Sequence, residues 1–206
     1  MTRGIRWRIF VLQVGLIGIL GFVAGFLFWG NSFVHNQVTT ELTAQKITFP
    51  TVGSAGFDAK TLGADHYNAL LPYAGQAMST GDQAEAYANN YIYVHLQGVA
   101  KGQTYSQVSG ALIAAQANPN TPASTISTLS GQRTTLFMGE TLRGLLLNAY
   151  GWWTVGQYAF YAAIGLTVAA FAVFAALVFE ILSMRRRHEV TQKVSAGRPA
   201  MVGGGQ

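Results

Sequence analysis

Two apolar stretches dominate the hydrophobic pattern of the chain. Residues 144–179 contain no formal charge and no proline, and residues 9–29 form a second apolar run whose one strongly polar member is Gln13. A bilayer core requires about 20 apolar helical residues. The pattern therefore predicts membrane-spanning helices at residues 9–29 and 155–183. The first run is too long for a secretory signal peptide and ends in large aromatic residues, so we expect an uncleaved anchor.

Apolar residues between the two runs recur with helical spacing. Val34, Val38 and Leu42 extend the first helix, and a similar stripe over residues 142–153 precedes the second apolar run. Capping boxes are predicted at Thr80 to Gln83 and at Thr104 to Gln107. Residues 123–132 are expected to be a short helix or a loop before the long final helix. No stretch alternates as a strand would, so the intervening domain is predicted to be helical.

The residues that flank the second apolar run predict its orientation. Trp152, Trp153 and Tyr158 stand at one end, where aromatic rings favour the membrane interface, and Arg185, Arg186 and Arg187 stand at the other, where basic residues favour the cytoplasm. The fold class is thus an all-α membrane protein, a two-span hairpin with a helical extracytoplasmic domain on extended helices. Its predicted parts are a cytoplasmic N-terminus (1–8), a first transmembrane helix (9–29), the outer domain (30–154), a second transmembrane helix (155–183) and a disordered basic cytoplasmic tail (184–206).

Composition supports a membrane protein and removes several classes of function. Half of the 206 residues are apolar and only 10% are charged, well below the usual quarter of a soluble domain. The net charge of +5 arises at the two ends of the chain, which indicates a lipid bilayer as partner and no nucleic acid. The absence of cysteine removes thiol nucleophiles and iron–sulfur ligands. We expect no cofactor.

Small residues recur every three or four positions in both apolar runs. Such residues let two helices approach closely in a membrane. The two small faces are therefore expected to pack on each other, on a membrane protein partner or on a second copy of the chain. The predicted packing residues are Gly15, Gly18, Gly21 and Gly25 in the first run and Ala162, Gly165 and Ala169 in the second.

Polar side chains that carry chemistry are few. His35, His66 and His95, together with glutamates, form a candidate set for a metal site of two histidines and a carboxylate, but no pair has the spacing of a helix-borne site. His95 lies beside a tyrosine-rich face, so a hydrogen-bonded packing role is favoured for it. Glu140 and Arg143, three residues apart, predict either an exposed helical pair or a polar contact with the outer domain or a partner.

Tyrosines are the other side chains of note in the predicted outer domain. They are candidates for a ligand pocket or an interface, where tyrosine is enriched, although their helical spacing favours core packing. The residues are Tyr87, Tyr91, Tyr93 and Tyr105.

Several segments resemble a group of two-span actinobacterial membrane proteins that are mostly called hypothetical. The resemblance lies in ELTAQKITFP (41–50), GDQAEAYANNYIYVHL (81–96), TYSQVS (104–109) and GETLRGLLLNAYGWW (139–153). It implies the two-span topology and a bacterial cytoplasmic membrane. Some members carry an aromatic ring-opening dioxygenase label, an activity that requires a metal-ligand set. No residue of this chain takes a functional role from the group.

Three classes of function follow as hypotheses. The first is a non-enzymatic accessory or structural subunit that binds a larger cell-envelope or respiratory assembly. The second is an extracytoplasmic ligand-binding or sensor protein, which would need a partner for its output because only a short tail follows residue 183. The third is a metal-dependent enzyme, disfavoured because no convergent polar constellation is visible in the sequence.

Overall fold

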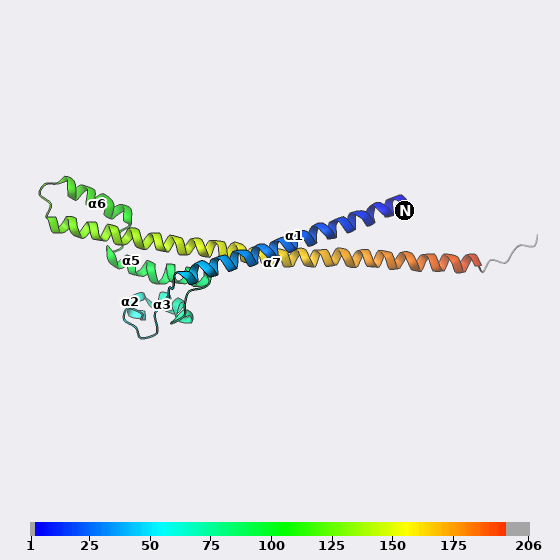
Figure 1. The fold of residues 1–206 in the computed structure, drawn as a ribbon, viewed down its shortest axis with the longest axis horizontal. Helices are drawn as coiled ribbons and strands as arrows, with labels where there is room; N and C mark the ends of the chain where they lie inside the picture. Colours follow the sequence, from blue (N-terminus) through cyan, green and yellow to red (C-terminus); the bar gives the residue numbers. More distant parts are fainter. Residues whose placement is uncertain (1–2, 197–206) are drawn as a thin grey trace, which may run out of the picture. The chain divides into compact units, whose positions relative to one another are not determined.

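The secondary structure of the described residues is helical throughout (Figure 1). The computed structural model describes residues 3–196, with side chains from Gly4 to Ser183 except that of Arg6. Nine helical segments are assigned in this range. They are α1 (Arg3–Ala44), α2 (Ala59–Leu62), α3 (Ala64–Leu70), the 3₁₀ turn η1 (Leu71–Tyr73), α4 (Gly81–Ala86), the π-helix η2 (Tyr87–Ile92), α5 (Tyr93–Val99), α6 (Tyr105–Ala117) and α7 (Ala123–Ala196).

The chain divides into two compact units. Among the described residues, one contains residues 3–29 and 159–196, and the other contains residues 30–158. We refer to the first as the two-helix unit and to the second as the helical domain. The boundary of the helical domain lies close to the predicted outer domain, residues 30–154.

The core of the helical domain uses most of the faces that the sequence pattern predicts on α1 and α7, although Leu142, at the start of the predicted stripe on α7, is 41% exposed. Val38 and Leu42 of α1 are buried, as are Leu136 and Leu146 of α7. The largest side chains with almost no exposed surface come from loops and short helices as well as from α6. They are Phe49, Phe57, Leu70, Met78, Val108 and Leu112. At 25 cal/mol per Å², burial of each such side chain stabilises the domain by about 1.5–3 kcal/mol.

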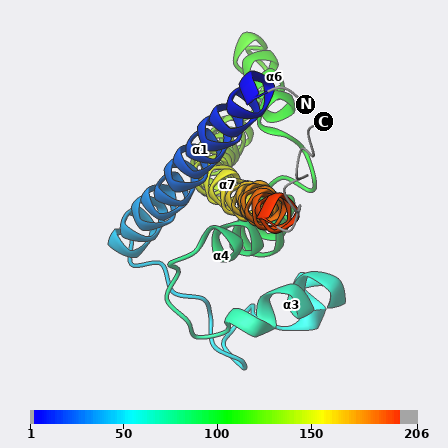
Figure 2. The ribbon, with the colours of Figure 1, turned by 90° about the vertical axis from the view of Figure 1, so that its right-hand side faces the viewer.

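Capping residues determine where two of the shorter helices begin. The Thr80 hydroxyl accepts a hydrogen bond from the Gln83 backbone N–H, and the Gln83 side chain accepts one from the Thr80 N–H. Thr104 and Gln107 form the same reciprocal pair at α6. Both predicted capping boxes are therefore confirmed. Figure 2 shows α3 and α4 of this domain.

Only one isolated bridge, between Thr48 and Ala77, represents β structure in residues 3–196. Hydrogen bonds from Phe49 N to Gln76 O and from Met78 N to Ile47 O hold the two segments together. This pairing buries Phe49 and Met78 on the domain core. The lack of any strand pattern in the sequence agrees with this described fold.

The long final helix differs from the prediction at both ends. It begins at Ala123, whereas a separate short helix or loop was expected over residues 123–132; that expectation is wrong. No proline follows Pro122 in this stretch, and the Thr128 hydroxyl is satisfied by the Ser124 carbonyl. The helix runs to Ala196, so residues 184–196, expected to begin a disordered tail, have helical backbone. No glycine or proline occurs between residues 184 and 196. Residues 197–206 lie outside the described residues.

Within the two-helix unit, α1 and α7 pack through positions that recur every three or four residues. Ala24, Ala163 and Leu177 are buried, and Phe28 meets Phe160 edge to face at 5.8 Å. An apolar groove of about 480 Å³ opens between the two helices. It is lined by Ile17, Gly21, Ala24, Gly25, Phe28, Thr167, Ala170, Phe171 and Phe174.

The predicted small faces lie only partly at this contact. Gly21 and Gly25 line the groove, and a Cβ added at either would meet nothing within 4 Å. On α7 the neighbouring row makes the contact instead: Ala163 and Leu177 are buried, and Ala170 lines the groove. The remaining predicted residues are exposed: Gly15, Gly18, Ala162, Gly165 and Ala169.

Two helices are long and apolar enough to cross a membrane. They are Trp7–Ala44 and Ala123–Ser183, the parts of α1 and α7 with described side chains. Only 6% and 11% of the residues in their most apolar windows are buried within the chain. A core helix of a soluble protein would be mostly buried, so the chain itself does not provide an apolar environment for these segments.

Candidate functional site

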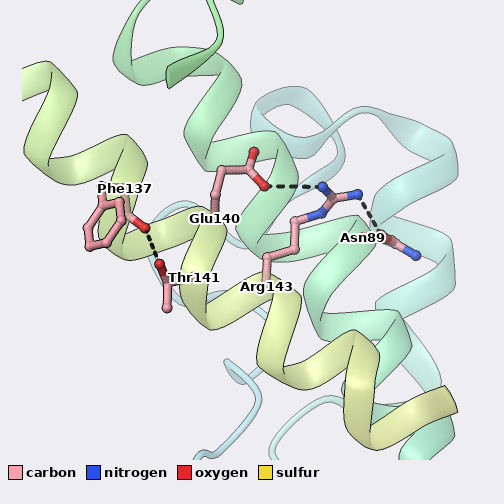
Figure 3. A network of polar contacts seen from close by, with 5 residues as sticks. All are labelled: Asn89, Phe137, Glu140, Thr141 and Arg143. Carbon is pink, nitrogen blue, oxygen red and sulfur yellow. Dashed lines mark hydrogen bonds and ion pairs between the residues drawn. The ribbon is translucent and has the colours of Figure 1, made fainter. Parts of the chain in front are cut away.

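A polar network joins α7 to the π-helix of the helical domain (Figure 3). The Arg143 guanidinium donates from one terminal nitrogen to Glu140 Oε2 at 3.2 Å and from the other to Asn89 Oδ1 at 3.0 Å. It also lies over the ring of Tyr93, 5.1 Å from the centroid. The Asn89 amide in turn donates to Glu85 Oε1 at 2.7 Å. We refer to these five residues as the Arg143 network.

The Arg143 network depends on a local change of helix winding. In η2 the backbone forms i→i+5 hydrogen bonds, as in the bond from Tyr93 N–H to Ala88 O. Asn90 adds a side-chain bond to the Ala86 carbonyl at 3.0 Å, a competition with backbone bonding that Asn favours. π-Turns are frequent at functional sites, so this segment is the strongest candidate site in the described domain.

The individual contacts in the network differ in strength. The ion pair of Glu140 and Arg143 is between side chains that are 43% and 27% exposed, and such surface pairs contribute a few tenths of a kcal/mol. The bond from Arg143 to Asn89 is partly buried and spans 54 residues, and a hydrogen bond to a charged group contributes about 1.5–3 kcal/mol. The network therefore works mainly as a tether that holds η2 against α7.

The three histidines have separate partners. His66 Nδ1 donates to Asn90 Oδ1 at 2.9 Å, and His95 Nδ1 donates to the Tyr91 carbonyl at 2.8 Å while its ring packs on Tyr91. His35 Nε2 donates to the Trp153 carbonyl at 3.1 Å. The packing role expected for His95 is confirmed. Among the described residues no three His, Asp or Glu side chains come close enough to share a metal ion.

Trp153 is the centre of a tightly packed junction. The His35 ring stacks on its indole with centroids 3.9 Å apart and planes 12° apart. A Cβ added at Gly81 would overlap the Trp153 side chain, and one added at Gly156 would lie 2.9 Å from the His35 ring. Glycine at these positions therefore lets α4, α1 and α7 approach closely.

The residues predicted for the membrane interface fall into three groups. Trp152 and Tyr158 are exposed, as interfacial rings would be. Trp153 is partly buried against the domain core, so it has a packing role. The side chains of Arg185, Arg186 and Arg187 lie outside the described residues.

Two of the four candidate tyrosines, Tyr87 and Tyr91, pack against the core, whereas Tyr93 and Tyr105 are exposed. Tyr87 meets Phe49 edge to face at 5.2 Å and Tyr91 at 4.9 Å. Burial raises the pKa of Tyr87 to about 12, with a smaller contribution from Tyr91. Tyr105 is exposed and contacts Phe137 at 5.8 Å. Core packing, the favoured interpretation of the spacing, describes Tyr87 and Tyr91.

Comparison of the chain with protein-family models, with curated proteins and with solved structures finds no match. The site therefore has to be interpreted from its own geometry. The sequence pattern singles out Glu140 and Arg143 but not Asn89, which is the residue that joins them to another helix. The adjacent pair Asn89-Asn90 inside an otherwise apolar and aromatic helix was the available signal.

Proposed function

We propose that this chain is a two-span protein of the bacterial cytoplasmic membrane, with both ends inside and the helical domain outside. The observation that carries this proposal is that two helices are each long enough to span a bilayer and that only 6% and 11% of the residues in their most apolar windows are buried within the chain. The orientation is supported by the basic residues at the two ends of the chain, which favour the cytoplasmic side.

For this protein we further propose a non-enzymatic accessory role, as a subunit that docks on a larger envelope or respiratory assembly. The polar side chains support this role. Arg143, His66 and His95 form hydrogen bonds with other groups of the chain, and their side chains do not converge on a cavity that could hold a substrate. The groove at Gly21 and Gly25 offers a partner helix a close approach.

Affinity purification of the tagged protein in a mild detergent, followed by mass spectrometry, tests the accessory role. Gly21→Leu fills the groove, whereas Gly15→Leu adds the same bulk at a position that does not line it. We expect a stoichiometric assembly with the wild type and with Gly15→Leu, and its loss with Gly21→Leu. Recovery of the chain without any other protein, or equal recovery from both variants, would contradict docking through the groove.

A sensor function is the second candidate, and the π-helix favours it. A ligand that binds the native domain raises its stability by RT ln(1 + [L]/Kd), so a thermal-shift screen of extracytoplasmic metabolites tests this function. A shift that the Asn89→Ala substitution abolishes would support a site at η2. The absence of any shift across the screen would leave the accessory role as the better account.

A further inference from the structure

The helical-domain part of α7 has an apolar face that nothing in the described chain covers. We define the outer face of α7 as Met138, Leu142, Leu145, Trp152 and Val155, all of which are exposed. Leu145 has 65% of its surface accessible. The spacing of seven between Met138, Leu145 and Trp152 places them in one row along the helix. An exposed apolar row of this length is typical of a protein interface.

Lipid does not account for the part of this face at residues 138–145 under the proposed topology, on which the inference rests. Leu145 precedes the predicted span at residue 155 by ten residues, about 15 Å of helix, and Met138 precedes it by about 25 Å. The headgroup region adds only about 5–8 Å beyond each side of the hydrocarbon core. Met138, Leu142 and Leu145 would therefore face water unless another protein covers them.

The polar groups near the outer face do not oppose association with an identical helix. Figure 3 shows Arg143 reaching toward Asn89, while Phe137 and Thr141 lie on the side of α7 away from it. The Thr141 hydroxyl is already satisfied by the Phe137 carbonyl at 2.7 Å. The face carries no formal charge, so two copies would not meet like charges across it.

Asn148 lies three residues after Leu145 and four before Trp152, on the same side of α7, and its side-chain amide has unused hydrogen-bonding groups. It is exposed and has no partner within the described part of the chain. In parallel two-stranded coils, a single Asn in the seam pairs with its own copy and determines the register. Counting by sevens from Asn148 leads to Val155, Ala162, Ala169 and Ala176, so the same register continues through small residues that are also exposed.

We propose that the outer face of α7 is the interface of a parallel homodimer, with Asn148 paired to Asn148 of a second copy. A helix that crosses the membrane and continues about 25 Å beyond it in the same direction would cover the whole row. A second copy supplies such a helix in α7, and membrane insertion fixes its direction as parallel. Two-fold symmetry then sets each apolar residue of the row against itself.

Cysteine cross-linking in intact membranes tests the homodimer, because the chain contains no native cysteine. The variants are Leu145→Cys and Asn148→Cys on the outer face, and Ile113→Cys on α6 as the control. Ile113 is 63% exposed, close to the 65% of Leu145, but lies on another helix. A disulfide needs Cα atoms within about 7 Å, so only positions at the interface should give oxidised dimers.

We expect cross-linked dimers of twice the chain mass for cysteine at residues 145 and 148, and none for cysteine at residue 113. No dimer at either face position, equal yields at all three, or cross-links to a protein of another mass would overturn the proposal. Labelling of the same cysteines with a membrane-impermeant maleimide reports the topology independently, so an error in the proposed orientation is recognised separately.

Charge substitutions provide a second measurement that does not depend on cross-linking geometry. Leu145→Glu and Leu145→Lys should each lose self-association, and co-expression of the two with different tags should restore a mixed dimer. Co-purification of identically charged copies at the wild-type level would overturn the proposal.

Discussion

Gly81→Ala should destabilise the helical domain more than alanine at either of two other helical glycines, Gly139 and Gly110. The new methyl group would overlap the Cβ and ring of Trp153. Those atoms lie close to the backbone of α7 and cannot rotate away, since the indole is held by its stack with His35. Overpacking of a rigid site costs about 3 kcal/mol at the upper end of its usual range.

Alanine substitutions at the two other glycines provide the comparison for the stability of Gly81→Ala. At Gly139 the added methyl would meet the end of the Leu96 side chain, which can change rotamer, so the expected cost is about 1 kcal/mol. At Gly110 on α6 nothing lies within 4 Å, and alanine in a helix interior is favoured over glycine by about 0.5–1 kcal/mol. The expected order of stability is Gly110→Ala, wild type, Gly139→Ala, Gly81→Ala.

Thermal unfolding of the detergent-solubilised protein, followed by tryptophan fluorescence, measures this order. A change of 1 kcal/mol shifts the Tm of a domain of this size by roughly 4 °C, so a cost of about 3 kcal/mol for Gly81→Ala should lower it by about 12 °C. A Tm for Gly81→Ala at or above that of Gly110→Ala would refute the packing of Gly81 against Trp153.

Three further predictions concern the rest of the domain. Thr104→Ala removes a capping box and should cost about 1 kcal/mol in the free energy of unfolding, measured in denaturant. Asn89→Ala should lower the free energy of unfolding more than Glu140→Gln does, because it leaves Arg143 without its interhelical acceptor. The ion pair of Glu140 and Arg143 contributes only tenths of a kcal/mol. Equal losses of stability in the two variants would contradict the role of Asn89 in holding η2 against α7. Because the pKa of Tyr87 is raised from 10.0 to about 12, the unfolded chain loses this proton first. Stability should therefore fall as pH rises through that interval. Tyr87→Phe should flatten that fall, and a Tm that is insensitive to the substitution in this range would contradict the burial of the hydroxyl.

The elements that the sequence predicted correctly are those governed by local interactions. Thr80 and Thr104 indicate the starts of α4 and α6 because each capping residue lies only three residues before its partner. The interaction is therefore contained in four consecutive residues and can be recognised from the sequence. Val38 and Leu42 are likewise buried as their spacing indicates. The long apolar runs could be recognised from the sequence because the length and hydropathy of a membrane span do not depend on which residues pack against it.

Features that depend on distant neighbours were not predictable in the same way. The stack of His35 on Trp153 joins residues 118 positions apart, and nothing local distinguishes Trp153 from the exposed Trp152 beside it. The π-helix at η2 adds one residue to a helical turn, and the 3.6-residue spacing of apolar residues does not reveal this extra residue. In α7 the regularly spaced small residues predicted the packing face, but the neighbouring row through Ala163 makes the contact with α1.

The central claim is that two helices cross a membrane and leave the helical domain outside. Labelling of single cysteines by an impermeant maleimide in intact cells tests it directly, since the chain has no cysteine of its own. We expect Ile113→Cys to be labelled in intact cells and Ser195→Cys only after permeabilisation. Labelling of Ser195→Cys in intact cells, or protection of Ile113→Cys, would contradict the proposed topology.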